Sequence, residues 1–469
     1  MIKNKYDDNC IDILNNQLNK EYILLFTSLL NKGNKKLSND ILIILINITF
    51  TKEGELFFGE DENIILNMAT FLGNNKNDIV LLESGITLIK NITYKNSFVK
   101  SILQNFKIIE FFNEIYQLYI LNNNFMDNLI LCLGHFIESG YTNNKDNLCS
   151  IKIIKSQLNK NFELKKLLRY VYIMYKLAKY NNPEIYKKMI EDEIHKSFMD
   201  IFIFDEDIEN RSDINEKDLK KFRLIIIKTI GKMLSLENNA YIKKIIESGI
   251  CEFLKKLLQY DDLNIIKNIF FCLYNICGGS TGQINYIYDN NTVFLSIEVA
   301  KNVYEIIKST NQFINNKISK EDLYKAFREI VYFFTILIIN SFTEILIPVV
   351  KYDNNIVIII LLEYLKLIEN DNNNKNDEII SNIIKAISKL LDYSKNNGKS
   401  KYFVEFLEKK GFKEILEKIQ INSSDNNMLD SEIILNEYFD DGNNNSNSIN
   451  IDDIINNDNN DSNNNNDDE

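Results

Sequence analysis

The two histidines and six cysteines are the side chains of this sequence best suited to nucleophilic, acid–base or metal chemistry. The cysteines form no CxxC pair and have only two histidines to join them, which argues against a zinc site or a disulfide framework and favours a reducing compartment. Neither His135 nor His195 lies near a cysteine or serine motif of the kind that a nucleophile–base pair requires. The carboxylates are numerous but scattered. The sequence therefore predicts no enzymatic activity, no metal and no cofactor.

The glycine-rich segment at 278–282 (GGSTG) is the part of the sequence nearest in type to a phosphate-binding loop. It lacks the GK[ST] ending of such loops, and it follows an expected helix rather than a strand. We therefore interpret Gly278 and Gly279 as the end of a helix, where glycine adopts the left-handed conformation that closes the last turn.

The charge of the sequence is divided unevenly. No Lys or Arg follows Lys418, whereas thirteen acidic residues lie between Asp425 and Glu469, so the chain's net charge of −12 leaves +1 on residues 1–418. A body so close to neutrality argues against direct binding of nucleic acid, because proteins that bind it concentrate basic residues. We expect the acidic, Asn-rich residues 442–469 to form a disordered tail.

No segment predicts secretion or a membrane span. The sequence begins with the polar and charged residues MIKNKYDDNC, which do not resemble a secretory signal. The longest apolar stretches, such as 331–339 and 356–362, fall far short of the ~18 residues that a spanning helix needs. We therefore expect no membrane insertion, and a location in the cytoplasm and nucleus.

An internal period carries the prediction of the fold. The triplet Asn-Ile-Thr at 47–49 recurs at 91–93, a step of 44 residues, and a further step of the same length reaches His135 in another apolar segment. The segments around Lys232 and Asn275 are related by a step of 43 residues. Periods of about 40–47 residues built from two or three helices are typical of armadillo and HEAT repeats. The sequence therefore predicts an all-α armadillo-repeat solenoid, a right-handed superhelix.

One unit of this repeat is especially clear. A turn at Gly249 precedes an amphipathic helix at 253–258, and a polar turn at 261–262 precedes a second helix at 265–277. The second helix is apolar on nearly every side, as the middle layer of a stacked solenoid requires.

The repeats are not uniform along the chain. Residues 200–218 and 305–322 lengthen the spacing and are expected to form long connections between helices, and 370–377 is expected to form a polar loop. We therefore predict one repeat domain over residues 1–441, followed by the tail at 442–469.

Three segments resemble one family of armadillo proteins. Residues 275–284 (NICGGSTGQI) resemble the SNIxAGxxxQI segment of importin alpha, the nuclear-import adaptor. Residues 406–419 (FLEKKGFKEILEKI) and 433–441 (IILNEYFDD) are similar to the glycine-turn helix and acidic finish that end the last repeat of that family. The resemblance covers about residues 20–441 at low identity and implies a divergent member of the family.

The resemblance also implies a binding site. In importin alpha, a ladder of asparagines hydrogen-bonds the backbone of an extended basic peptide, and an amide can indeed offer a donor and an acceptor to one peptide unit. The positions that match this ladder are Asn47, Asn91, Asn275 and Asn340, together with three replaced positions, His135, Lys176 and Lys232. The alternative for the asparagines is that they are polar helix residues bonded locally in an Asn-rich chain. For His135 the alternative is a structural role.

The tryptophans that hold lysine side chains in importin alpha are all missing. The positions four residues before the ladder hold Ile43, Thr87, Leu131, Tyr172, Lys228, Phe271 and Ile336. Only Tyr172 and Phe271 keep an aromatic face that could hold a cation, and both are also explained as core packing. A lysine at 176 or 232 would repel a basic peptide.

The resemblance implies an adaptor that binds an extended, basic, nuclear-localisation-type peptide of a cargo protein in a concave groove, for nuclear import. The basic N-terminal segment with which importin alpha binds importin beta is not recognisable, so importin beta is not expected as a partner through that segment. The alternative is a general cytoplasmic armadillo scaffold without an import role. Acidic side chains beside the asparagines would favour the import adaptor, and an apolar or basic surface would favour the scaffold.

Overall fold

The chain is helical throughout the part that the structure describes. This computed structural model describes residues 20–32, 34–94, 96–158, 163–203, 215–310, 319–369, 377–422 and 425–439. No β-strand occurs within these ranges, and the predicted tail at 442–469 lies outside them. The all-α prediction is therefore confirmed.

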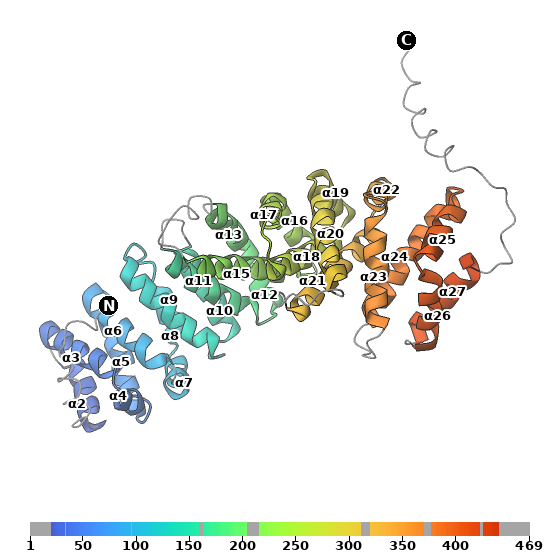
Figure 1. Ribbon diagram of the computed structural model, residues 1–469. Coiled ribbons are helices and arrows are strands. Elements are labelled where there is room, and N and C mark those ends of the chain that lie inside the picture. Colours follow the sequence, from blue (N-terminus) through green and yellow to red (C-terminus); the bar gives the residue numbers. More distant parts are fainter. Residues whose placement is uncertain are drawn as a thin grey trace, which may run out of the picture. The chain divides into compact units, whose positions relative to one another are not determined.

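The fold consists of two compact units, 1–360 and 361–469, whose boundary falls within α23 (Ile356–Glu369). In the first unit, seven helices pack on one another in chain order, and we call them the stacked helices (Figure 1). The stacked helices are α3 (Lys35–Ile48), α6 (Ile79–Thr93), α9 (Asn123–Glu138), α11 (Leu164–Ala178), α15 (Glu216–Leu234), α18 (Leu263–Cys277) and α21 (Lys320–Asn340).

Further helices, most of them shorter, flank the stacked helices and complete each repeat. These flanking helices are α2 (Lys20–Leu30), α4 (Lys52–Phe57), α5 (Glu62–Asn74), α7 (Ser97–Asn105), α8 (Ile108–Ile115), α10 (Asn144–Lys155), α12 (Pro183–Glu191), α13 (Ile194–Ile203), α16 (Asn239–Glu247), α17 (Ile250–Leu257), α19 (Thr281–Asp289), α20 (Thr292–Thr310) and α22 (Thr343–Lys351). Two flanking helices precede each of α6, α9, α15, α18 and α21, which is the repeat that the period of 43–44 residues predicts, whereas among the described residues α10 alone precedes α11.

The second unit contains one further repeat after its own long helix. Its helices are α24 (Asp377–Asn396), α25 (Ser400–Lys409), α26 (Phe412–Asn422) and α27 (Asp425–Ile434), and a π-helical turn follows at Leu435–Phe439. Tyr438 and Phe439 of that turn are buried, and the ring of Phe439 packs edge-on against Phe412 with a centroid distance of 6.2 Å.

Local sequence signals explain where the helices of the clear repeat begin. Gly249 precedes α17 with φ 98°, a conformation that favours glycine. Asp262 precedes α18, and its carboxylate accepts hydrogen bonds from the backbone N–H groups of Asn264 at 2.8 Å and Ile265 at 3.0 Å. This cap satisfies two donors that a helix start would otherwise leave unpaired.

The core lies between the stacked helices. Phe270 of α18 is fully buried, and its ring centroid lies 5.6 Å from that of Phe333 and 6.3 Å from that of Phe334, both on α21. A helix that is covered on both sides by its neighbours needs apolar residues around most of its circumference. This is the burial that the sequence of 265–277 predicts.

The left-handed conformation predicted for Gly278 and Gly279 is wrong. Gly278 has φ −70° and ψ −12°, and Gly279 is not among the glycines with positive φ. Helix α18 instead ends through ordinary backbone bonds from these two N–H groups to Tyr274 O and Ile276 O. Gly279 serves close packing, because a Cβ at that position would overlap the side chain of Gln283.

The two long connections predicted at 200–218 and 305–322 are shortened by helix at both ends. Helix α13 extends to Ile203 and α15 begins at Glu216, while α20 extends to Thr310 and α21 begins at Lys320. The remaining residues of these connections lie outside the described part of the chain, as does most of the loop predicted at 370–377.

Candidate peptide-binding surface

The seven positions of the predicted ladder occupy equivalent places in the fold. Each lies within the last four residues of a stacked helix, and each side chain is half-buried. We call this set the row; in chain order it consists of Asn47, Asn91, His135, Lys176, Lys232, Asn275 and Asn340. Because successive stacked helices pack side by side, the row runs across unit 1 from one repeat to the next.

Several members of the row bond to the end of the preceding stacked helix. Asn91 Nδ2 donates to Thr49 Oγ1 at 2.8 Å, at the end of α3. Asn340 Nδ2 donates to the carbonyl of Cys277 at 2.9 Å, the last residue of α18. Carbonyls in the last turn of a helix have no partner within the helix, so Asn340 satisfies one that would otherwise need water. These asparagines therefore have a local structural role.

The amide groups are only partly used by these bonds. Asn275 Nδ2 donates to Phe271 O at 2.8 Å within its own helix. Asn91, Asn275 and Asn340 therefore each commit one N–H and, among the described residues, keep the second N–H and the Oδ1 acceptor available. Asn47 has no side-chain hydrogen bond within the described residues and is half-buried. One donor and one acceptor from the same amide are what a single peptide unit can use.

His135 lies in an environment that keeps its imidazole neutral. Its Nδ1 is 3.2 Å from Thr93 Oγ1, and Tyr94 meets the ring edge-on at a centroid distance of 5.3 Å. Burial lowers the pKa of His135 to about 4, and the nearby Lys100 and Lys90 contribute in the same direction. A neutral, partnered imidazole fits the structural role that the sequence left open.

The two aromatic residues one helical turn before the row, Tyr172 and Phe271, already contact other parts of the chain. Lys176 Nζ lies 5.0 Å from the centroid of the Tyr172 ring, and Lys221 Nζ lies 5.9 Å from it. Phe271 packs on the neighbouring helix, because a Cβ on Gly231 would lie 2.9 Å from Phe271 Cδ1. The Tyr172 ring is therefore already approached by two lysines of the chain itself, and one edge of the Phe271 ring packs against α15.

A group of lysines on three successive stacked helices was largely missed by the sequence analysis. We call it the lysine patch; it consists of Lys176, Lys179, Lys221, Lys228, Lys232 and Lys267, on and directly after α11, on α15 and on α18. Within the described residues none of the six forms an ion pair; Lys232 Nζ instead donates to Asn181 Oδ1 at 3.1 Å. A search for lysines without an acid three or four residues away would have found five of the six, all except Lys221, which follows Asp218.

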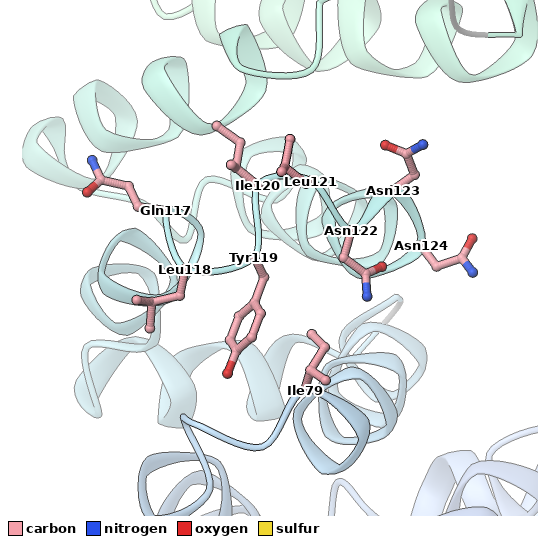
Figure 2. Close-up of a pocket in the computed structure, with 9 residues that line it drawn as sticks. All are labelled: Ile79, Gln117, Leu118, Tyr119, Ile120, Leu121, Asn122, Asn123 and Asn124. Carbon is pink, nitrogen blue, oxygen red and sulfur yellow. The ribbon is translucent and has the colours of Figure 1, made fainter.

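A pocket of about 830 Å³ lies elsewhere, at the connection between α8 and α9 (Figure 2). Its lining consists of residues 117–124 and Ile79, and it includes no member of the row. Tyr119 extends toward Ile79, whereas Ile120 and Leu121 point to the opposite side of the connection. Leu121 is 92% exposed, so the pocket is bordered by an unusually open apolar side chain.

The remaining chemistry-bearing side chains are isolated. The five cysteines within the described residues are free, and burial raises the pKa of Cys132 to about 12 and that of Cys251 to about 11, so these thiols are protonated at neutral pH. Across the described residues no three His, Cys, Asp or Glu side chains come together as metal ligands would. No single described helix is long and apolar enough to span a membrane. One bent pair of helices, 343–351 with 356–368, reaches the required length and apolar composition only when the two are taken together.

Comparisons with known proteins support the fold. No family model matches the chain, and neither does any curated protein. An engineered protein of known structure matches at 11% identity over 90% of this chain and all of that chain, with a TM-score of 0.57. A chain from a structural study of the phosphorylation switch between cadherin and beta-catenin matches at 10% identity over 88% of this chain and 74% of that chain, with a TM-score of 0.63.

A designed armadillo repeat protein, crystallised with the peptide (KR)4, matches at 18% identity over 60% of this chain and 97% of that chain, with a TM-score of 0.42. The two matches with TM-scores above 0.5, together with the stacking of the helices in chain order, show that the chain has an armadillo-type fold. At these identities the similarity concerns the fold alone, and the importin alpha family in particular is not identified by it.

Proposed function

We propose that this chain is an adaptor that binds an extended segment of a partner protein along the row. The observation that carries the proposal is the state of the row amides. Each of Asn91, Asn275 and Asn340 has one N–H fixed by the fold and keeps one donor and one acceptor for a ligand. A side chain held in one orientation before binding loses less conformational entropy when a ligand arrives.

An extended segment suits this surface for a geometric reason. Stacked helices lie about 8–10 Å apart, and an extended chain advances about 3.3 Å per residue. Amides on successive helices therefore meet peptide units about three residues apart. Bonds to the backbone of the segment provide affinity without reading its side chains, and the charges beside the row then select the partner.

The import form of the proposal concerns the first three stacked helices. Asp40 lies two helical turns before Asn47 on α3, and Glu138 lies one turn after His135 on α9. Both carboxylates are exposed, and within the described residues neither forms an ion pair. A basic, nuclear-localisation-type cargo peptide bound over α3, α6 and α9 would provide cations to pair with these two carboxylates. A protein with this role would move between the cytoplasm and the nucleus.

The test is a fluorescence titration with a basic peptide. We expect a labelled Lys-rich peptide of about eight residues to bind the full chain, and the Asn47→Ala/Asn91→Ala variant to bind it about tenfold or more weakly. The reason is that each alanine removes a donor and an acceptor from the peptide backbone. The binding should also weaken with added salt, because its charged contacts are screened.

Two controls make this test specific. An Asn63→Ala/Asn105→Ala variant removes two exposed amides from flanking helices and should leave the affinity unchanged. A Thr49→Val variant keeps the Asn91 amide but removes the bond that orients it, together with the bond from Thr49 Oγ1 to Ile46 O, and should weaken binding less than the loss of the amide itself. Equal affinity of the wild type and the Asn47/Asn91 variant, or no binding by either, would contradict the proposal.

The lysine patch favours a second form of the proposal. A scaffold without an import role needs no acidic surface, and a basic peptide would be repelled over α11, α15 and α18. The two forms differ in the charge of the segment that this part of the row accepts.

A further inference from the structure

The lysine patch is a local excess of positive charge that the fold itself leaves uncompensated. Lys176 and Lys221 both approach the ring of Tyr172, at 5.0 and 5.9 Å, so their ammonium groups share one small region. Burial lowers the pKa of Lys228, and the neighbouring Lys267 and Lys179 lower it further. Like charges held this close repel one another, and an added anion would relieve that repulsion.

The flanking helices of the same repeats show that this excess is not a general property of the chain. There, lysines are paired with acids one turn away, as in Lys187 with Glu191 on α12 and Lys243 with Glu247 on α16. The lysines of the patch instead lie on or directly after stacked helices and form no ion pair within the described residues, and only Lys221 has an acid one turn away, Asp218. The charge is therefore concentrated on the surface that carries the row.

Two acidic residues border the patch without neutralising it. Glu138 of α9 raises the pKa of Lys176, after the larger effect of Tyr172, but forms no ion pair with it. On the other side Glu329 of α21 lies near Lys267 and is already paired with Arg328 at 3.4 Å. The patch thus has a carboxylate at each border but no ion pair of its own within the described residues, so its net charge remains positive.

We infer that this part of the row, across α11, α15 and α18, binds an acidic extended segment of a partner protein. The inference rests on the proposed function, since it names the charge of the segment that the row accepts there. It predicts a ligand of opposite charge to the cargo expected over α3, α6 and α9. The two halves of the row then bind different segments.

A peptide fits this surface better than a nucleic acid does. Asn275 lies on α18, the helix that carries Lys267, and it offers both a donor and an acceptor, which a single peptide unit can use. The phosphodiester linkage only accepts hydrogen bonds, so it would leave the Asn275 acceptor without a partner. The ring of Tyr172, which could stack on a base, is instead covered by two lysines.

The experiment compares three fluorescent probes on the full chain. They are a peptide of about eight alternating Glu and Ser residues, its Lys and Ser counterpart, and a single-stranded oligothymidine of the same length. Alternation places every acid on one side of an extended peptide, facing the lysines. Each titration is repeated with the acids of residues 440–469 changed to their amides, so that this acidic segment cannot compete for the patch.

We expect the acidic peptide to bind, and a Lys228→Gln/Lys267→Gln variant to bind it about tenfold more weakly. A Lys187→Gln/Lys243→Gln variant loses the same net charge from flanking helices and should stay within about twofold of the wild type. Raising the salt concentration should weaken binding by the wild type more than binding by the Lys228/Lys267 variant.

The outcomes separate the inference from the function on which it rests. Acidic-peptide binding that is equal in both lysine variants would overturn the inference, and so would tighter, patch-dependent binding of the oligothymidine. If the basic peptide still depends on Asn47 and Asn91 in either case, the proposed function stands. If no peptide binds, both fail.

Discussion

An alanine at position 270 should lower the free energy of unfolding by about 3–5 kcal/mol, the largest loss we expect from one side-chain truncation. Phe270 is fully buried between α18 and α21, where its ring meets those of Phe333 and Phe334. Removing the ring takes away its burial and leaves a cavity that two rigid neighbouring helices cannot close. Denaturant unfolding followed by circular dichroism measures the loss.

Phe342→Ala is the matched control, because Phe342 is 57% exposed and its loss should change stability by only about 0.5 kcal/mol. Hydrogen exchange adds a spatial test. In a repeat array each unit is stabilised by its neighbours, so faster exchange should be concentrated in α15, α18 and α21. A loss no greater than that of Phe342→Ala would show that α18 and α21 do not share a tight core.

The fold was predictable because equivalent residues of successive repeats recur at a fixed spacing in the sequence. The triplets at 47–49 and 91–93 predicted equivalent positions in successive repeats, and both lie at the ends of stacked helices. The polar turn at 261–262 predicted the start of α18, since Asp262 can cap a helix without help from distant residues. Signals of this kind depend on a few neighbouring residues, so the sequence alone carries them.

The bonds of the row were not predictable, because they join residues from different repeats. Asn91 reaches Thr49 across 42 positions, and whether it does so depends on how α6 packs against α3. The missed conformation at Gly279 has the same origin. A glycine after a helix predicts a left-handed turn, but here the glycine makes room for the side chain of Gln283.

The lysine patch is a part of the candidate site that comparison of sequences alone does not identify. Lys176, Lys228 and Lys267 are far apart in the chain, and only the packing of α11, α15 and α18 brings them to one surface. Comparison with a family treats each position separately, and at Lys228 it shows only that the tryptophan of importin alpha is missing. The charge of a surface is a property of several repeats together, and it requires their arrangement in space.

Acid should destabilise the first unit strongly, because both of its histidines are buried in their neutral form. Burial lowers the pKa of His195 to about 4, as it does for His135, and His195 is only 1% exposed. Above the unfolded-state pKa of about 6.5 the folded and unfolded chains bind equal numbers of protons at these sites. Below it, only the unfolded chain takes up protons, so stability falls as the pH approaches 4.

The expected loss is up to about 1.4 kcal/mol per pH unit for each histidine, over the window between pH ~6.5 and ~4. Denaturant unfolding at several pH values measures the slope, and a His195→Leu variant should reduce the slope contributed by the two histidines by about half. Comparing slopes cancels the carboxylates, which titrate in both proteins. NMR of the imidazole protons measures the pKa of each histidine in the folded chain directly. If they titrate near pH ~6.5, burial does not hold the histidines neutral, and the acid sensitivity has another origin.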